Sequence, residues 1–288
     1  MLLSTATTHT PKIRRWAARL LVGTTFATMA ALPAVGDAGA DPTSPATVLT
    51  LSGATTLVST PMEQELRGDL CRAPRTCKKV DYPSNQVGGY TLEIGLANLD
   101  KAINATPGPK TVFGYSQGAI IASMWLQQKA ASSNVPAGSL TFVLAGNAQR
   151  GENGKMPLTK TGAATPTTTG YKVIDVSRQY DGLSDYPDNQ RNFEAVQNAN
   201  DGYSTVHADY TGVNYNDPTN LVKKVGNTYY VVNPTRDLPS LDGYRKWGLG
   251  WYADAQQPAL KARIDAAYNR GDYRTVAQFG ALDPFPSA

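Results

Sequence analysis

Residues 110–118 read KTVFGYSQG, and this stretch decides the fold. Its first four residues are a short β-prone run that leads directly into Gly114-Tyr115-Ser116-Gln117-Gly118, which has G-x-S-x-G spacing. The two glycines permit a turn so tight that a Cβ atom would collide with the neighbouring strand or helix. Residues 119–129 then continue with helical spacing. The stretch therefore predicts a strand, a sharp turn and a helix, with Ser116 at the carboxyl edge of a sheet.

The pattern around this turn alternates short β-prone runs with helical ones. Such alternation is typical of a mostly parallel sheet flanked by helices. Residues 41–288 are long enough to bury one substantial core, so we expect a single α/β domain. The expected strands are residues 46–51, 110–113, 140–145 and 171–176; the expected hairpin joins 221–225 to 228–232; the expected helices are 91–105, 119–129 and 259–269; and residues 151–170 are expected to be a connector.

Residues 1–40 have the features of a secretory signal peptide. An apolar stretch over residues 20–34 precedes a small-x-small cleavage pattern at Ala38-Gly39-Ala40. The apolar stretch is too short, and too rich in Thr, Ala and Gly, for a membrane span of about 20 residues. We therefore expect cleavage near Ala40 and a secreted or cell-envelope-associated protein, with an uncleaved N-terminal anchor as the alternative. The positive region ahead of the apolar stretch is formed by Lys12, Arg14, Arg15 and Arg19.

Removal of this segment changes the charge of the chain. The whole sequence has 27 basic and 23 acidic residues, a net charge of +4, but residues 1–40 hold four of the basic residues and only one acidic residue. The remainder has a net charge of +1. Bulk charge therefore gives no support for a nucleic-acid partner or an anionic membrane partner.

Cys71 and Cys77 are the only cysteines. In an exported chain, two cysteines so close in sequence predict a small disulfide loop, with two free thiols as the alternative. A structural zinc site needs four protein ligands. After Ala40 the chain offers a single histidine besides these cysteines, so we expect no metal.

That histidine is His207, and it lies downstream of Ser116. A serine hydroxyl is a poor nucleophile at neutral pH and needs a base to accept its proton. A lone histidine is often only a solvated loop residue. Given the G-x-S-x-G turn upstream, we expect His207 to be the base.

The acid that orients the histidine should follow a strand that lies between Ser116 and His207 in the chain. Asp175 lies inside the expected strand, whereas Asp181 comes just after it, so we select Asp181. Asp185 is the main rival. Two further carboxylates, Asp201 and Asp209, are expected to be solvated loop residues. The chain order serine, aspartate, histidine is that of the α/β-hydrolase fold.

Two backbone amides are expected to bind the developing oxyanion. The Gln117 amide lies at the start of the helix, where N–H groups and the positive dipole end point toward the serine. The second donor is expected in the loop after the first strand, within Gly53–Thr55, and we select Ala54. Four tyrosines are expected either to wall an acyl cleft or to pack against their own loops. They are Tyr180, Tyr186, Tyr203 and Tyr210.

The run Gly114–Ala119 resembles the nucleophile turn of cutinases, which are secreted esterases. A wider resemblance, over about residues 46–246, is to the PE-PPE domain, a serine-hydrolase domain known mainly from mycobacteria and related actinobacteria. The segments that carry it are LAGNAQR at 144–150, SRQYDGLSDYP at 177–187, HADY at 207–210 and PTRDLPSL at 234–241. The sequence departs from the family in lacking proline after Arg150. It also shows no PE or PPE module ahead of the domain, and we expect the signal peptide to serve for export.

The resemblance implies esterase activity on acyl esters, with some members similar to acyltransferases for cell-wall glycolipids. Carried over by position, it implies Ser116 as nucleophile, Asp181 as acid and His207 as base. We therefore expect a serine esterase that acts on an acyl ester or lipid, with an acyltransferase as the alternative and a catalytically silent cell-envelope binding domain as a third hypothesis. The expected partners are cell-envelope lipids. We expect a monomer without cofactor, metal or nucleic acid.

Overall fold

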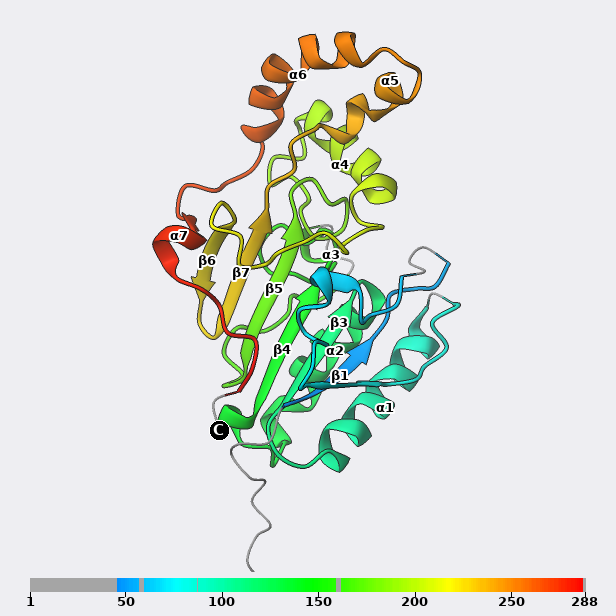
Figure 1. The fold of residues 1–288 in the computed structure, drawn as a ribbon, viewed down its shortest axis with the longest axis vertical. Coiled ribbons are helices and arrows are strands. Elements are labelled where there is room, and N and C mark those ends of the chain that lie inside the picture. The colour runs from blue at the N-terminus through cyan, green and yellow to red at the C-terminus, as the bar shows by residue number, and fades with distance from the viewer. Residues whose placement is uncertain (1–45, 57–59, 87, 159–161, 287–288) are drawn as a thin grey trace, which may run out of the picture. The chain divides into compact units, whose positions relative to one another are not determined.

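A single sheet organises the computed structural model, which describes residues 46–56, 60–86, 88–158 and 162–286 (Figure 1). Within these residues, eight strands are hydrogen-bonded in the order β2-β1-β3-β4-β5-β7-β6-β8. The signal peptide expected over residues 1–40 lies outside the described residues. The strands are β1 (Thr47–Leu51), β2 (Thr76–Lys79), β3 (Lys110–Tyr115), β4 (Leu140–Ala145), β5 (Lys172–Arg178), β6 (Leu221–Val225), β7 (Thr228–Asn233) and β8 (Arg274–Thr275).

The first six strands of this order are parallel, and β6 and β8 add antiparallel pairs at one edge. Every residue of β3 and β4 is buried. Continuous burial is expected for parallel strands that are covered on both faces. The mostly parallel sheet and the single α/β arrangement of the described residues confirm the predicted α/β-hydrolase class.

The register of the central strands brings their carboxyl ends to one edge. Tyr115 of β3 pairs with Ala145 of β4, and Ala145 pairs with Val176 of β5. The residues that follow these three strands therefore lie close to one another. This edge receives Ser116, Gly146 and the turn after Arg178.

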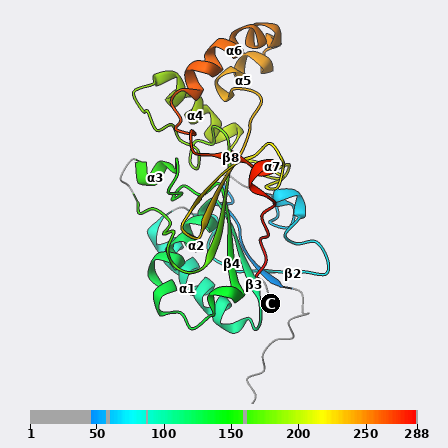
Figure 2. The same cartoon turned by 90° about the vertical axis from the view of Figure 1, so that its left-hand side faces the viewer.

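Helices α1 and α2 cover one face of the sheet, and the short helices η1 and α7 with irregular segments cover the other (Figures 1 and 2). Successive strand residues point to opposite faces, so Val112 packs in one core with α1 and α2, and Phe113 packs in a second core on the other side. The α-helices are α1 (Gly89–Ala105), α2 (Gln117–Gln128), α3 (Lys155–Leu158), α4 (Phe193–Thr205), α5 (Asp242–Lys246), α6 (Gly250–Asp265) and α7 (Val276–Phe279), and the 3-10 helices are η1 (Glu65–Gly68), η2 (Ala130–Ser132), η3 (Ala137–Ser139) and η4 (Pro239–Leu241).

Four of these helices, α4, η4, α5 and α6, pack together beyond the carboxyl ends of β5 and β7 (Figure 1). We call this group the helical lobe. A third apolar core holds it together and includes Tyr180, Leu241 and Ile264. The lobe therefore connects directly to the turn that follows β5.

The disulfide between Cys71 and Cys77 is present, with a Cα–Cα distance of 5.4 Å. It closes the short loop that leads into β2, the edge strand of the sheet. This confirms the pairing predicted from the cysteine spacing. None of the helices in the described part of the chain combines the length and apolar character that a membrane span needs.

One expectation about elements was wrong, and several elements were not expected. The last long helix begins at Gly250 rather than at residue 259, because the chain accommodates Pro258 inside α6. The connector over residues 151–170 contains the short helix α3. Strand β2 was not expected. Its sequence, TCKK, is mostly exposed and carries no apolar alternation that could reveal it.

Candidate active site

Ser116 occupies a strained turn between β3 and α2, with φ 52° and ψ −113°. A Cβ atom on Gly114 would lie 2.6 Å from the Gly118 carbonyl oxygen, and one on Gly118 would lie 2.2 Å from the Leu51 carbonyl oxygen. Both positions therefore require glycine. The Ser116 amide donates a hydrogen bond to the Ala145 carbonyl at 2.8 Å. This contact ties the turn to the end of β4.

The structure brings Ser116, His207 and Asp181 into one hydrogen-bonded chain. Ser116 Oγ lies 2.9 Å from His207 Nε2. His207 Nδ1 lies 2.8 Å from Asp181 Oδ2 and 3.0 Å from Asp181 Oδ1. The three side chains come from the turn after β3, the turn after β5 and the segment after α4. All three are buried, with Ser116 the most exposed at 6%.

Asp181 accepts hydrogen bonds from several donors besides the imidazole. The Tyr210 hydroxyl donates to Oδ2 at 2.7 Å, and the backbone amides of Leu183 and Ser184 donate to Oδ1 at 2.8 and 3.0 Å. Burial alone would raise the pKa of this carboxyl, but the charge of His207 and the hydrogen bonds from His207, Tyr210 and Leu183 outweigh it and lower the pKa to about 2. The arrangement therefore favours a carboxylate.

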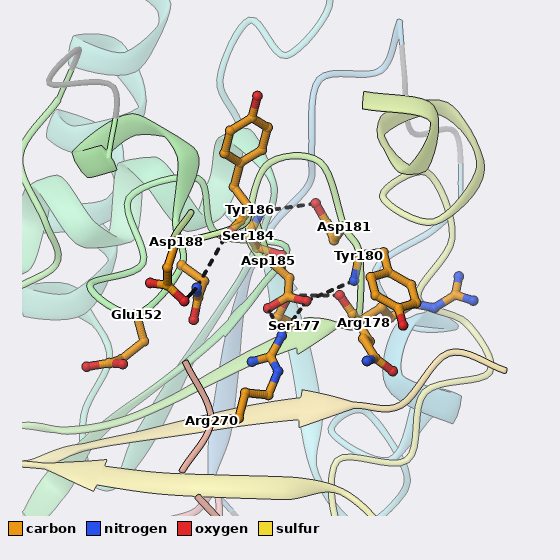
Figure 3. A network of polar contacts seen from close by, with 12 residues as sticks. Glu152, Ser177, Arg178, Tyr180, Asp181, Ser184, Asp185, Tyr186, Asp188 and Arg270 are labelled. Atoms are coloured by element: carbon orange, nitrogen blue, oxygen red, sulfur yellow. Dashed lines mark hydrogen bonds and ion pairs between the residues drawn. The ribbon is translucent and has the colours of Figure 1, made fainter. Parts of the chain in front are cut away.

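Asp185, the rival acid, faces a different partner (Figure 3). Arg270 Nη2 donates to its two carboxyl oxygens at 2.6 and 2.7 Å, and the Tyr180 amide donates to Oδ2 at 2.8 Å. Burial raises the pKa of Asp185, and Arg270 opposes that rise. The Asp185 carboxylate thus holds the turn that carries Asp181, whereas the histidine contact belongs to Asp181.

The other three carboxylates that the sequence offered lie in separate contacts. Asp175 is buried in β5, where Arg150 Nη1 lies 3.2 Å from Oδ1 and Asn147 Nδ2 donates to Oδ2 at 2.9 Å. Asp201 accepts from the Gln197 amide group, and Asp209 accepts from the hydroxyl and backbone amide of Thr211. These contacts are separate from those of His207.

Three contacts around His207 were not predicted from the sequence, and two of the residues, Tyr115 and Gly146, were not selected at all. The Tyr115 hydroxyl donates to the His207 carbonyl oxygen. The Tyr203 ring stacks on the imidazole, with centroids 5.8 Å apart and planes 12° apart. Gly146 has φ 58°, and a Cβ atom there would lie 3.0 Å from His207 Cε1. Tyr115 occupies the variable position of G-x-S-x-G, and Gly146 lies just after a predicted strand, but neither pattern indicates a contact with His207.

The four tyrosines were expected to have one of two roles, walling an acyl cleft or packing, and two of them pack inside the protein. Tyr180 and Tyr210 are completely buried. Tyr210 bonds to Asp181, and the Tyr180 hydroxyl donates to Asp265 of α6 at 2.5 Å. Tyr186 is also buried, whereas Tyr203 is 36% exposed. Of the four, Tyr203 is thus the one that both contacts the imidazole and reaches the surface.

The two selected oxyanion donors remain predictions. The Gln117 amide is the first of α2 and therefore has no acceptor within its own helix. Gly118 packs against the Leu51 and Ser52 carbonyls, so the loop after β1 lies beside the serine turn. In that loop the Thr55 amide donates to the Ser84 carbonyl at 2.8 Å and is already used. Ala54 lies next to it and is buried.

In the part of the chain that the structure describes, no group of three His, Cys, Asp or Glu side chains is arranged to hold a metal ion. The chemistry that the site can perform with its own residues is proton transfer from Ser116 to His207, with Asp181 stabilising the imidazolium.

Comparison with known proteins adds a family assignment. The profile of the PE-PPE domain matches residues 69–269. The uncharacterised PPE family protein PPE42 of Mycobacterium tuberculosis is 31% identical over 70% of this chain and 39% of its own length. The esterase PE16 of the same species is 32% identical over 60% of this chain and 36% of its length.

A third relative, the diacyltrehalose acyltransferase Chp2 of M. tuberculosis, is 27% identical over 66% of this chain and 60% of its length. Across the curated relatives, the chain matches between 33% and 60% of their length. Among solved structures, a cutinase-like protein from Cryptococcus sp. is similar over 49% of this chain and 79% of its own, with a TM-score of 0.37 and 18% identity.

Proposed function

Because this chain belongs to the PE-PPE domain family, whose members include an esterase and acyltransferases, we propose that it is a secreted serine esterase that cleaves acyl esters through Ser116, His207 and Asp181. The family relatives support a hydrolase or an acyl-transferring enzyme. The observation that carries the proposal is the continuous hydrogen-bonded chain from the Ser116 hydroxyl through His207 to a buried carboxylate.

In the proposed reaction, His207 Nε2 takes the Ser116 proton as Oγ attacks the ester carbonyl carbon. The tetrahedral intermediate places negative charge on the former carbonyl oxygen, which the Gln117 amide and an amide near Ala54 stabilise. The C–O bond to the leaving alcohol then breaks, and the imidazolium returns its proton to that alcohol. Water repeats the sequence on the acyl-enzyme and releases the acid.

Asp181 has two tasks in this sequence. Its hydrogen bond to Nδ1 fixes the tautomer that leaves Nε2 free to accept a proton, and its negative charge stabilises the imidazolium. The amides of Leu183 and Ser184 and the Tyr210 hydroxyl hold the carboxylate in that position.

The test is hydrolysis of p-nitrophenyl acyl esters by the protein and its Ser116→Ala variant, with Ser204→Ala, an exposed serine in the last turn of α4, as the matched control. We expect the Ser116 variant to lose activity by at least about a thousandfold and the control to keep it. A fluorophosphonate probe should label Ser116. Equal rates for the Ser116 variant and the parent protein would refute the proposal, and absence of labelling would favour a silent binding domain.

A second candidate function is acyl transfer, favoured by the similarity to two acyltransferases of M. tuberculosis. The same acyl-enzyme would be attacked by a sugar hydroxyl of a cell-wall glycolipid rather than by water, and the outcome depends on how well water is kept out. Product analysis with such an acceptor present separates the two. Free acid as the sole product argues for the esterase, and an acylated acceptor argues for transfer.

Export is part of the proposal and rests on residues 1–40. N-terminal sequencing of the protein recovered from the culture medium or cell envelope should give a first residue close to Asp41. Recovery of an intact N-terminus from the membrane fraction would instead support an uncleaved anchor.

A further inference from the structure

The helical lobe carries a surface that the proposed reaction does not use. Six large apolar side chains are exposed there, and we call this set the aromatic face. Phe193 lies at the start of α4, Trp247 follows α5, and Trp251 lies in the first turn of α6; these three are between 72% and 85% exposed. The full set is Phe193, Tyr244, Trp247, Leu249, Trp251 and Tyr252.

These side chains are concentrated on one part of the described surface. Among the described residues, the only other large apolar side chains that are similarly exposed are Tyr90 on α1 and Tyr203 beside His207. Single exposed apolar residues need no explanation, but a contiguous group marks an interaction site. The lobe does not need them for its own stability, because its core is formed by other residues such as Leu238, Ala253 and Ile264.

An open groove of about 460 Å³ runs between α4 and the α5–α6 pair, within the aromatic face. The groove has an apolar part, formed by Phe193, Leu241, Tyr244, Tyr252 and Leu260, and a polar part, formed by Glu194, Gln197, Ser240, Gln256 and Arg263. A second, smaller hollow lies against Tyr244, Trp247 and Leu249. Apolar hollows between protruding aromatic side chains offer places for hydrocarbon chains to settle.

Most of the cations around the aromatic face are paired with acidic side chains. Arg263 contacts Glu194 at 2.7 Å, Arg245 contacts Asp254 at 3.1 Å, and Arg236 contacts Asp237 at 3.2 Å. Lys246 and Arg191 are exposed and form no ion pair within the described residues. A surface meant for an anionic partner would offer more cations without acidic neighbours. The attraction that this face offers is therefore mainly apolar.

We propose that the aromatic face docks onto the surface of a lipid bilayer or lipid aggregate whose headgroups carry no net charge. Trp and Tyr combine an apolar ring with a polar atom and are favoured at the boundary between water and lipid. Exposed side chains near helix ends can insert into lipid, because a fluid lipid phase does not need a surface of complementary shape. Docking would bring the candidate active site close to the lipids that contain its acyl esters. This consequence rests on the proposed function.

The lobe also links this face to the reacting residues. Helix α4 begins at Phe193 and includes Tyr203, which stacks on His207. At about 1.5 Å per residue, its 13 residues span about 20 Å. Helix α4 thus connects Phe193 of the aromatic face to the side chain that contacts His207.

The experiment measures binding of the purified protein to phosphatidylcholine vesicles by flotation. We expect the double variant Trp247→Ser, Trp251→Ser to bind at least about tenfold more weakly than the parent protein. Tyr90→Ser is the matched control, because it removes an aromatic side chain of equal exposure outside the face, and it should bind as the parent does. Equal binding by the double variant and the parent would overturn the proposal.

Two further measurements test whether an anionic lipid or a second copy of the chain binds the aromatic face instead. Adding phosphatidylglycerol or raising the salt concentration should change binding less than about twofold, because most of the cations around the face are paired with acidic side chains. Binding that requires the anionic lipid would overturn the proposal. Light scattering should show a monomer, and a dimer that the double variant dissociates would assign the face to a second copy of the chain.

A spectroscopic readout reports on the face itself. In the protein without residues 1–40, the tryptophans are Trp125, which is buried in the core, and the pair Trp247 and Trp251. Brominated phosphatidylcholine should quench the emission of that pair, and absence of quenching in the floated protein would overturn the proposal. The Ser116→Ala variant should bind vesicles normally, so that loss of activity and loss of docking are separate results.

Discussion

At the scale of single residues, the site depends on groups that act through His207 and Asp181. Tyr115 holds the carbonyl of His207, and Tyr210 and two backbone amides hold the carboxylate of Asp181. Tyr115, Tyr210 and Ser184 are buried, so the loss of one of these donors would leave a buried polar partner without that hydrogen bond. The orientation of the imidazole is therefore set by the protein interior.

Replacing Asp181 or Asp185 by asparagine should distinguish the roles of the two carboxylates. Asp181→Asn should lower kcat by at least about a hundredfold, because the amide no longer stabilises the imidazolium. Asp185→Asn leaves Arg270 without its carboxylate and should chiefly lower stability, by about 3 kcal/mol. Steady-state kinetics and urea unfolding measure the two effects. A larger kcat loss in the Asp185 variant would contradict the assignment.

The Asp181 carboxylate should make stability depend on pH. Its pKa falls from the ordinary 3.8 to about 2 in the folded protein, so its contribution is present above about pH 4 and is lost as pH falls toward 2. The shift corresponds to about 2 kcal/mol. Urea unfolding of the parent protein and the Asp181→Asn variant should differ most above pH 4, and a difference that grows below pH 4 would contradict this.

Gly146 should tolerate no side chain. Gly146→Ala places a Cβ atom 3.0 Å from the imidazole and puts alanine at φ 58°, so we expect the ring to shift and kcat to fall by at least about tenfold. Gly138→Ala is the control, because a Cβ atom there meets nothing within 4 Å. Similar kcat values in the two variants would show that the imidazole has room to move.

At the scale of elements, the sequence predicted those strands and helices whose residues are buried in a regular pattern. Strand β4 and the β6–β7 hairpin begin where predicted, since apolar residues and the Gly226-Asn227 turn mark them. Strand β2 could not be predicted, because an exposed edge strand is stabilised by the neighbour it pairs with and not by its own pattern.

The candidate site could likewise be predicted only in part from the sequence. Ser116, Asp181 and His207 could be selected because they follow recognisable elements or are scarce in the sequence. Tyr210 and Gly146 could not be selected, because their contacts depend on how distant segments meet. The start of α6 was misjudged since Pro258 suggests a helix start, whereas it lies at the ninth position of a helix that tolerates the missing amide.

The disulfide constrains the loop that leads into β2, and its contribution to stability can be measured. Replacing Cys71 and Cys77 by serine should lower the free energy of unfolding by about 2 kcal/mol, the value expected for a short closed loop. The loop lies at the edge strand, so kcat should be unchanged. Urea unfolding and ester hydrolysis check both statements, and a large fall in kcat would link the loop to the site.

At the scale of the whole described unit, the C-terminal segment covers the sheet face opposite α1 and α2 (Figure 2). Leu282 is buried in the core on that face, and the Thr111 hydroxyl of β3 donates to the Pro284 carbonyl at 2.9 Å. Arg75 lies 4.3 Å from the centre of the Phe285 ring. The last described residues thus join β3 to the segment before β2.

Truncation of the Leu282 side chain should affect stability more than catalysis. Leu282→Ala should lower the free energy of unfolding by about 2 to 3 kcal/mol, because it leaves a cavity in the core against the sheet. The kcat for p-nitrophenyl esters should stay within about twofold of the parent value. Thermal unfolding and kinetics test the pair of statements, and an unchanged melting temperature would show that the segment is dispensable.

The contact between Thr111 and Pro284 also fixes when folding can finish, since it joins residues 173 positions apart. A nascent chain still on the ribosome has made β1, β3, β4 and β5 long before Leu282 or Phe285 exists to cover them. Until residues 282–285 have emerged, the sheet face that they cover stays open to other chains, as unfinished sheets do. The core on that face therefore forms late, and a chaperone that shields the face would serve the chain during that interval.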